Sequence, residues 1–106
     1  MVPRKIIKTL RKFRAELEQQ GIRVDKMILY GSRASGKFRA NSDIDVAIVS
    51  PDFGKDRFEE GVKLFQIASK IDPRIEPVPI SPKSLEQDTW IPLIYEIREK
   101  GQEIQP

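Results

Sequence analysis

The chain has 106 residues, of which 33% are charged, and 19 Lys or Arg against 16 Asp or Glu give a net charge of +3. It contains no cysteine and no histidine, which excludes disulfides and thiolate or imidazole metal sites and leaves carboxylates for acid–base or metal chemistry. The cation that suits such ligands is Mg²⁺ or Mn²⁺. This length predicts a single domain over residues 1–106. No apolar run approaches the roughly 20 residues of a membrane span, so we expect a cytoplasmic protein.

The first predicted element is an amphipathic helix over about residues 3–20. Apolar residues recur at helical spacing from Ile6 to Leu17, and Gly21 is a good helix stop. Residues 1–14 carry six Lys or Arg and no acid. Such a face is more often solvated than bound to nucleic acid, and there is no aromatic platform for bases, so nucleic acid is not the expected partner. Nucleic-acid binding through this helix stays open as an alternative.

The rest of the chain predicts strands and helices in alternation. We expect strands at 24–30 and 43–50, a helix opened by an Asp56–Glu59 capping box and ended before Pro73, an edge strand at 74–81, a short helical turn after Ser81, a helix at 92–100 and a terminal strand at 102–105. The third strand is placed at an edge because Pro77 and Pro79 cannot donate ladder hydrogen bonds. The fold class is therefore α/β (α+β), a small mixed sheet flanked by helices.

Two clusters of apolar residues could lie either in the core or on the surface. The helix after Asp56 bears Phe58, Val62 and Phe65 beside further aliphatic residues, and residues 90–95 hold Trp90, Ile91, Leu93, Ile94 and Tyr95. We expect residues 90–95 to pack in the core, with a patch that faces a partner as the alternative.

An aspartate pair opens the second strand. Side chains alternate along a strand, so Asp43 and Asp45 point the same way, about 6.6 Å apart, while Ile44 and Val46 turn to the core. Ionising both carboxyl groups is opposed by their mutual repulsion, which a divalent cation removes. Two such cations could clamp the attacking and leaving oxygens of a phosphoryl or nucleotidyl transfer.

A glycine-serine turn follows the first strand. Gly31 permits close backbone approach, and the amides of residues 32–35, at the start of a short helix, are expected to point at an anion. The Ser32 hydroxyl can add a donor, and Arg33, Lys37 or Arg39 can add positive charge. A phosphate is the expected guest.

The segment "GSRASGKFRANSDID" holds Gly31, Ser32, ten residues, Asp43, one residue and Asp45. This pattern resembles the GS-x10-DxD signature of the polymerase β nucleotidyltransferase superfamily, and most closely its minimal (MNT) domains encoded beside HEPN-domain proteins. The resemblance implies the polymerase β-type fold. It also implies that Asp43, Asp45 and a third acid, Glu76, bind Mg²⁺ (or Mn²⁺) and perform catalysis. Gly31, Ser32 and Arg33 would bind the nucleoside triphosphate.

The resemblance further implies a Mg-dependent nucleotidyltransferase that moves AMP (NMP) from ATP (NTP) to a hydroxyl acceptor. The acceptor would be a tyrosine of a partner HEPN toxin, so that the protein acts as an antitoxin by protein adenylylation. The alternative is a catalytically weak or inactive antitoxin that neutralises its partner by binding. A homo-oligomer is compatible with either.

Overall fold

The computed structural model describes residues 2–36, 39 and 41–106. Its elements follow the order α1 (Arg4–Gln19), β1 (Lys26–Tyr30), α2 (Ser32–Ser35), β2 (Ile44–Val49), α3 (Arg57–Ile71), β3 (Ile75–Ile80), α4 (Pro82–Gln87), α5 (Pro92–Lys100) and β4 (Gln102–Glu103). One sheet has the strand order β3-β2-β1-β4. β1 is antiparallel to β2 and β4, whereas β2 and β3 are parallel. The sheet is therefore mixed, as predicted.

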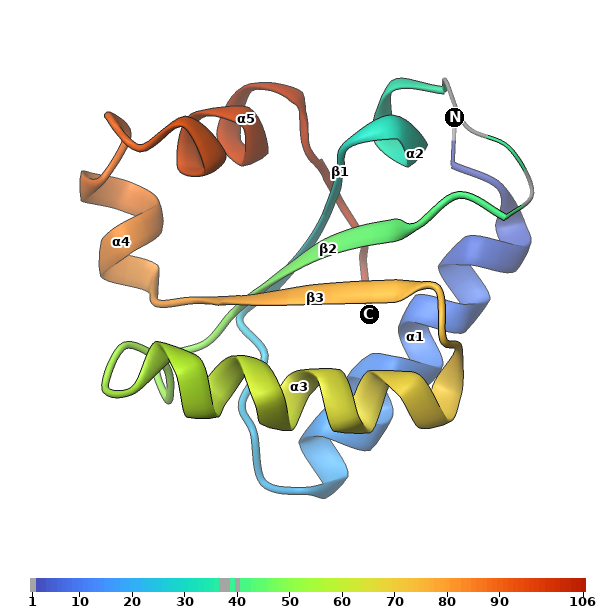
Figure 1. The fold of residues 1–106 in the computed structure, drawn as a ribbon, viewed down its shortest axis with the longest axis horizontal. Coiled ribbons are helices and arrows are strands. Elements are labelled where there is room, and N and C mark those ends of the chain that lie inside the picture. The colour runs from blue at the N-terminus through green and yellow to red at the C-terminus, as the bar shows by residue number, and fades with distance from the viewer. Residues whose placement is uncertain (1, 37–38, 40) are drawn as a thin grey trace.

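The two sheet faces are covered by different helices. Figure 1 shows α1 and α3 on one side of the strands, α4 and α5 on the other, and the short helix α2 at the end of β1. Ala34 of α2 packs against the core that α1 and α3 form. The first face packs Met27, Leu29 and Val46 against apolar residues of α1 and α3. The second face packs Ile28 and Ala47 with Ile97 of α5, among others. Because neighbouring residues of a strand point to opposite faces, β2 is apolar at nearly every position and only Asp45 interrupts it.

Most predicted elements are confirmed. β3 lies at an edge of the sheet and pairs only with β2, which accommodates Pro77 and Pro79. The predicted capping box forms only in part: Asp56 accepts a hydrogen bond from the Glu59 amide. In a full capping box the Glu59 carboxylate would accept a hydrogen bond from the Asp56 amide. Here the Glu60 carboxylate accepts that bond instead, together with bonds from the amides of residues 54 and 55.

The prediction that residues 90–95 pack in the core is wrong at its two aromatic positions. Trp90 is 79% exposed and Tyr95 57% exposed, whereas Ile94 is buried. Tyr95 is turned to solvent because α5 packs on the sheet by its other face, whereas Trp90 lies in the turn between α4 and α5. Within residues 2–36, 39 and 41–106, no helix combines the length and the apolar character that crossing a lipid bilayer requires.

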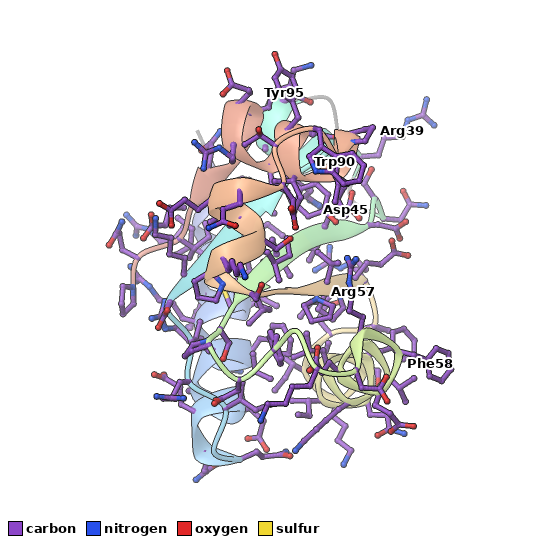
Figure 2. All side chains as sticks on the ribbon, turned by 90° about the vertical axis from the view of Figure 1, so that its left-hand side faces the viewer. Arg39, Asp45, Arg57, Phe58, Trp90 and Tyr95 are labelled. Carbon is purple, nitrogen blue, oxygen red and sulfur yellow. The ribbon has the colours of Figure 1, made fainter. Side chains whose placement is uncertain are left out.

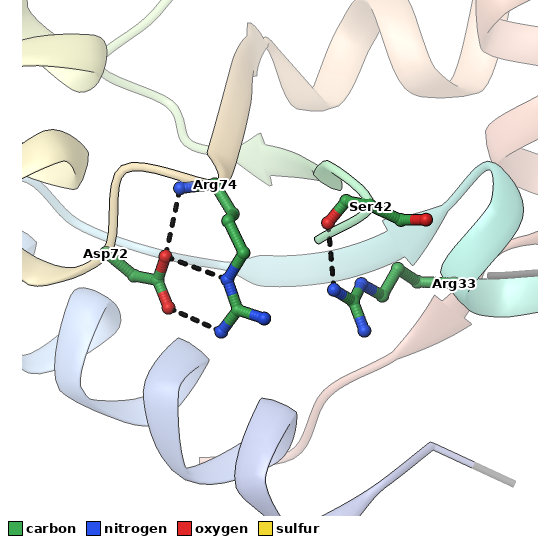
Figure 3. A network of polar contacts seen from close by, with 4 residues as sticks. All are labelled: Arg33, Ser42, Asp72 and Arg74. Carbon is green, nitrogen blue, oxygen red and sulfur yellow. Dashed lines mark hydrogen bonds and ion pairs between the residues drawn. The ribbon is translucent and has the colours of Figure 1, made fainter. Parts of the chain in front are cut away.

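Two polar contacts fix the starts of β2 and β3 (Figure 3). The Arg33 guanidinium donates a hydrogen bond to the Ser42 carbonyl oxygen over 2.8 Å, just before β2. Asp72, which follows α3, accepts from the Arg74 backbone amide at 2.9 Å and forms an ion pair with the Arg74 side chain at 2.7 Å. The ion pair holds the pKa of Asp72 below its ordinary value of 3.8, chiefly through the hydrogen bond from Arg74. These contacts hold the strand ends that carry Asp43, Asp45 and Glu76.

We expect Asp72→Asn to lower the free energy of unfolding at pH 7 by about 1 kcal/mol, a figure that allows for solvent screening of the half-exposed Arg74. Because the pKa of Asp72 is lower in the folded state, the unfolded state binds the proton more readily. The stabilisation is thus present above pH 3.8 and is lost as the pH falls through the folded-state pKa. Urea unfolding at pH 7 and at about pH 2.5 measures the effect, and an equal difference between the two proteins at both pH values would contradict it.

Candidate active site

The acidic residues lie at one end of the sheet, on the face that α5 covers. Asp45 of β2 lies opposite Tyr30 of β1 on one side and opposite Glu76 of β3 on the other. Asp43 stands exposed just before β2, and Ile44 between the two aspartates is fully buried. The predicted alternation is confirmed, and the strand register brings the three acids together from segments far apart in sequence.

The carboxyl groups of Asp43, Asp45 and Glu76 lie close enough to raise one another's energy when ionised, which shows in the pKa values of Asp45 and Glu76. Burial raises the pKa of Asp45, and the charge of Asp43 raises it further. Glu76 is exposed, but partial desolvation of its carboxyl group, followed by the charges of Asp43 and Asp45, also raises its pKa. The proximity of the two carboxyl groups lowers the pKa of Asp45 in part and raises the pKa of Glu76 further. A proton thus relieves part of the repulsion, a role that a cation would fill more completely.

Two residues that the sequence did not single out also face this group. The pKa of Tyr30 is raised to about 12 by burial and by the charges of Asp45, Glu96 and Glu76. Glu96 of α5 also raises the pKa of Asp45. Tyr30 could have been predicted to lie near the site, because it directly precedes the glycine-serine turn. Glu96 lies 20 residues after Glu76 and matched no motif, so only the packing of α5 on the sheet reveals it.

Gly31 brings the turn against the acidic group. Its backbone has φ 75° and ψ −152°, a conformation that side chains disfavour. A Cβ added there would overlap the Asp45 Oδ2 atom and lie 3.3 Å from the Asp45 Cγ atom. Only glycine therefore lets the turn pass this close to the carboxylate.

The short helix α2 differs in part from the expected anion site. The amides of Ala34 and Ser35 both donate to the Gly31 carbonyl oxygen at 3.2 Å, so the prediction that they point at an anion is wrong. They close the helical turn instead. The Ser32 hydroxyl, which is half-buried, forms no hydrogen bond with the described residues and remains available.

Arg33 is 3% exposed, and its guanidinium bonds the Ser42 carbonyl oxygen rather than extending over the carboxylates. Its burial indicates that it positions the segment before Asp43; nucleotide binding by Arg33 stays a prediction. The exposed Arg39 lies on the same side of the molecule as Asp45 (Figure 2). Lys37 lies outside the described residues.

Residues 7–102 match the nucleotidyltransferase domain family. The chain belongs to this family. The match spans the glycine-serine turn, both aspartates and Glu76, so the family predicted from GS-x10-DxD is confirmed. No curated protein matches the chain significantly.

Solved structures confirm the nucleotidyltransferase fold. A protein of Sulfolobus solfataricus assigned as a nucleotidyltransferase is 14% identical, with a TM-score of 0.66 over 93% of this chain and 78% of its own. A toxin–antitoxin structure with AMP-PNP is 24% identical, with a TM-score of 0.61 over 93% and 72% of the two chains. The MntA-HepT toxin–antitoxin structure is 20% identical, with a TM-score of 0.60 over 92% and 70%.

The residues of this nucleotidyltransferase domain fit a hard cation in chemistry and charge. Asp43, Asp45 and Glu76 offer only oxygen ligands, and the raised pKa values of Asp45 and Glu76 reflect negative charge that a dication would offset. Within the described part of the chain, no three acidic side chains surround a single point closely enough to form a ready-made metal site. To bind an ion together, the three carboxylates must therefore rotate towards a common point. The exposed side chains of Asp43 and Glu76 are free to do so.

Proposed function

We propose that this nucleotidyltransferase domain uses Mg²⁺ (or Mn²⁺) to transfer AMP from ATP to a hydroxyl group and releases pyrophosphate. The observation that supports the proposal is the register that sets Asp45 beside Glu76, next to Asp43 and directly against Gly31. Acids paired in this way are costly unless a cation neutralises them. A polyphosphate is a substrate that brings such cations with it.

Each residue has a distinct proposed role. Asp43, Asp45 and Glu76 would hold the metal, which supplies charge neutralisation at the phosphates when bound. Gly31 lets the turn approach, and the Ser32 hydroxyl donates to a phosphate oxygen. Arg33 holds the Ser42 carbonyl oxygen and so fixes the approach to Asp43.

The proposed reaction is a displacement at the α-phosphorus of ATP. The acceptor oxygen bonds to this phosphorus while the bond to the bridging oxygen of the β-phosphate breaks, and pyrophosphate leaves. Glu76 accepts the proton of the acceptor hydroxyl. A carboxylate is the available kind of general base here, because the chain contains no histidine.

The proposed acceptor is a tyrosine of a HEPN-domain toxin, which the modification would silence. The similarity to toxin–antitoxin structures, one of them with AMP-PNP, supports this choice at the level of the fold. The carboxylates stand at an open sheet end, which suits an acceptor presented by another protein. One hollow is lined by residues of β1 and α5, and another by residues of α3 with Gln20. Neither is lined by any of the three acids.

The decisive experiment incubates the protein with the HEPN protein encoded beside it and with ATP labelled at either the α- or the γ-phosphate. We expect the partner to gain label from α-labelled ATP only, and to lose it when EDTA is present. Transfer of the γ-label would indicate phosphorylation instead. Tight association without either label would favour the binding-only antitoxin.

Metal binding has a readout that needs no activity. At pH 7 and ten times its dissociation constant, Mg²⁺ should stabilise the fold by about 1.4 kcal/mol and raise Tm by about 5 to 10 °C. Asp45→Asn should remove most of this increase, whereas Glu103→Gln, at an exposed acid on β4, should retain it. Thermal unfolding monitored by circular dichroism tests this expectation. An equal increase in the Asp45→Asn protein would contradict the proposed ligands.

A further inference from the structure

An apolar stripe on α3 lies uncovered. Phe58, Val62 and Phe65 are 77%, 38% and 56% exposed, and their spacing places them on one face of the helix. Leu64, Ile67 and Ala68 hold the opposite side of α3 in the core. Figure 2 shows Phe58 projecting outward from α3, away from the rest of the molecule. Two exposed phenylalanines on one helix face are typical of an interaction surface.

Gly61 borders this stripe on the side that faces β3, and no contact with a described residue requires a glycine there. Glycine in a helix interior costs about 1 kcal/mol relative to alanine. The backbone of Gly61 does not have a positive φ, and a Cβ added there would meet only the Pro79 side chain at 4.0 Å, an ordinary contact. Alanine would therefore fit the isolated protein. A glycine at this place allows another backbone to approach closely.

The charges of α3 are arranged to complement those of a second α3. Glu59, Glu60 and the N-cap residue Asp56 lie before Gly61, whereas Lys63 and Lys70 lie after it. Arg57, the exception, lines a separate hollow with Ser84 and Asp88. Neither Glu59 nor Lys63 forms an ion pair with the described residues. An antiparallel pair of α3 helices brings the acidic half of each against the basic half of the other.

We propose that the stripe Phe58–Val62–Phe65 binds a second copy of this chain through antiparallel packing of α3 about a two-fold axis between Gly61 and Val62. Phe58 of each copy then lies opposite Phe65 of the other, as a two-fold interface requires. Glu59 of each copy lies beside Lys63 of the other. The dimer does not rest on the proposed function, because no residue of the acidic site takes part.

Analytical ultracentrifugation of the full chain over a range of micromolar concentrations tests the dimer. We expect the mass to rise from 12.2 kDa towards twice that value as concentration increases. Phe65→Asp should abolish the rise, whereas Tyr95→Asp, at an exposed aromatic residue of α5, should leave it unchanged. A mass of 12.2 kDa at every concentration would overturn the proposal, as would a rise that Phe65→Asp leaves intact.

Two further variants separate docking from folding. Gly61→Ala should raise Tm by a few degrees, because alanine favours the helix, and should still weaken the dimer by about tenfold. Glu59→Lys should weaken the dimer, and the double variant Glu59→Lys/Lys63→Glu should restore it. Unchanged association in Gly61→Ala, or no rescue in the double variant, would reject the antiparallel geometry. If Phe65→Asp instead reduces transfer to the HEPN protein while the chain stays monomeric, the stripe binds the acceptor and the proposal is wrong.

Discussion

Asp45→Asn is expected to reduce AMP transfer on the order of 10³-fold or more. Asp45 is the central acid: it lies between Tyr30 and Glu76 across the sheet and against Gly31. Asparagine keeps the size of the side chain but removes the negative charge and one anionic metal ligand. The measurement is the initial rate of labelling of the acceptor protein with α-labelled ATP, at saturating ATP and Mg²⁺.

The same substitution should make the metal-free protein more stable, not less. A carboxyl group whose pKa is raised on folding favours the folded state when protonated, and this contribution is lost as the pH rises through the folded-state pKa. At pH 7 the ionised Asp45 is therefore unfavourable, and Asn removes that cost. We expect a higher Tm for Asp45→Asn than for the parent protein in EDTA at pH 7, and a smaller difference at pH 4.

These two readouts distinguish a functional acid from a structural one. If Asp45 only supported the fold, its replacement would lower activity and stability together. Asp25→Asn is a suitable control, since this acid lies at the far end of β1 and should leave the labelling rate unchanged. Full labelling by the Asp45→Asn protein would exclude the proposed site.

The placement of the candidate site residues in the fold could be predicted because it depends on local rules. Strand alternation placed Ile44 in the core and Asp45 on the opposite face, and the two prolines of β3 placed that strand at an edge. The ten-residue spacing from Ser32 to Asp43 was enough to indicate the family. Each of these inferences needed only a few neighbouring residues.

What could not be predicted depends on contacts between distant segments. Arg33 follows the signature serine directly, yet its guanidinium is buried on the Ser42 carbonyl oxygen. Glu96 reaches the acidic group only because α5 packs on the same sheet face. Phe58 and Phe65 have the periodicity of core residues, but the core side of α3 is already filled by Leu64 and Ile67. Side-chain type and spacing do not specify which of two apolar faces a helix buries.

Gly31→Ala is expected to reduce transfer by at least about 100-fold while the protein remains folded. Two effects combine at this position. Alanine at φ 75° and ψ −152°, a conformation essentially restricted to glycine, costs roughly 1 to 3 kcal/mol of stability. Its Cβ would also occupy the place of the Asp45 Oδ2 atom, so the carboxylate must rotate away from the position it shares with Glu76.

Gly36→Ala is the matched control for Gly31→Ala. Gly36 also has a positive φ, 81°, but its ψ of 2° places it in the left-handed helical region, where alanine is strained less than at Gly31. Among the described residues, no atom lies within 4 Å of a Cβ added at Gly36. Both variants should lose stability in urea unfolding, Gly36→Ala by less than Gly31→Ala, and only Gly31→Ala should lose labelling activity and the Mg²⁺-dependent rise in Tm. If both variants lose activity equally, backbone strain in the turn is the cause. Displacement of the Asp45 carboxylate would then not explain why glycine is needed at position 31.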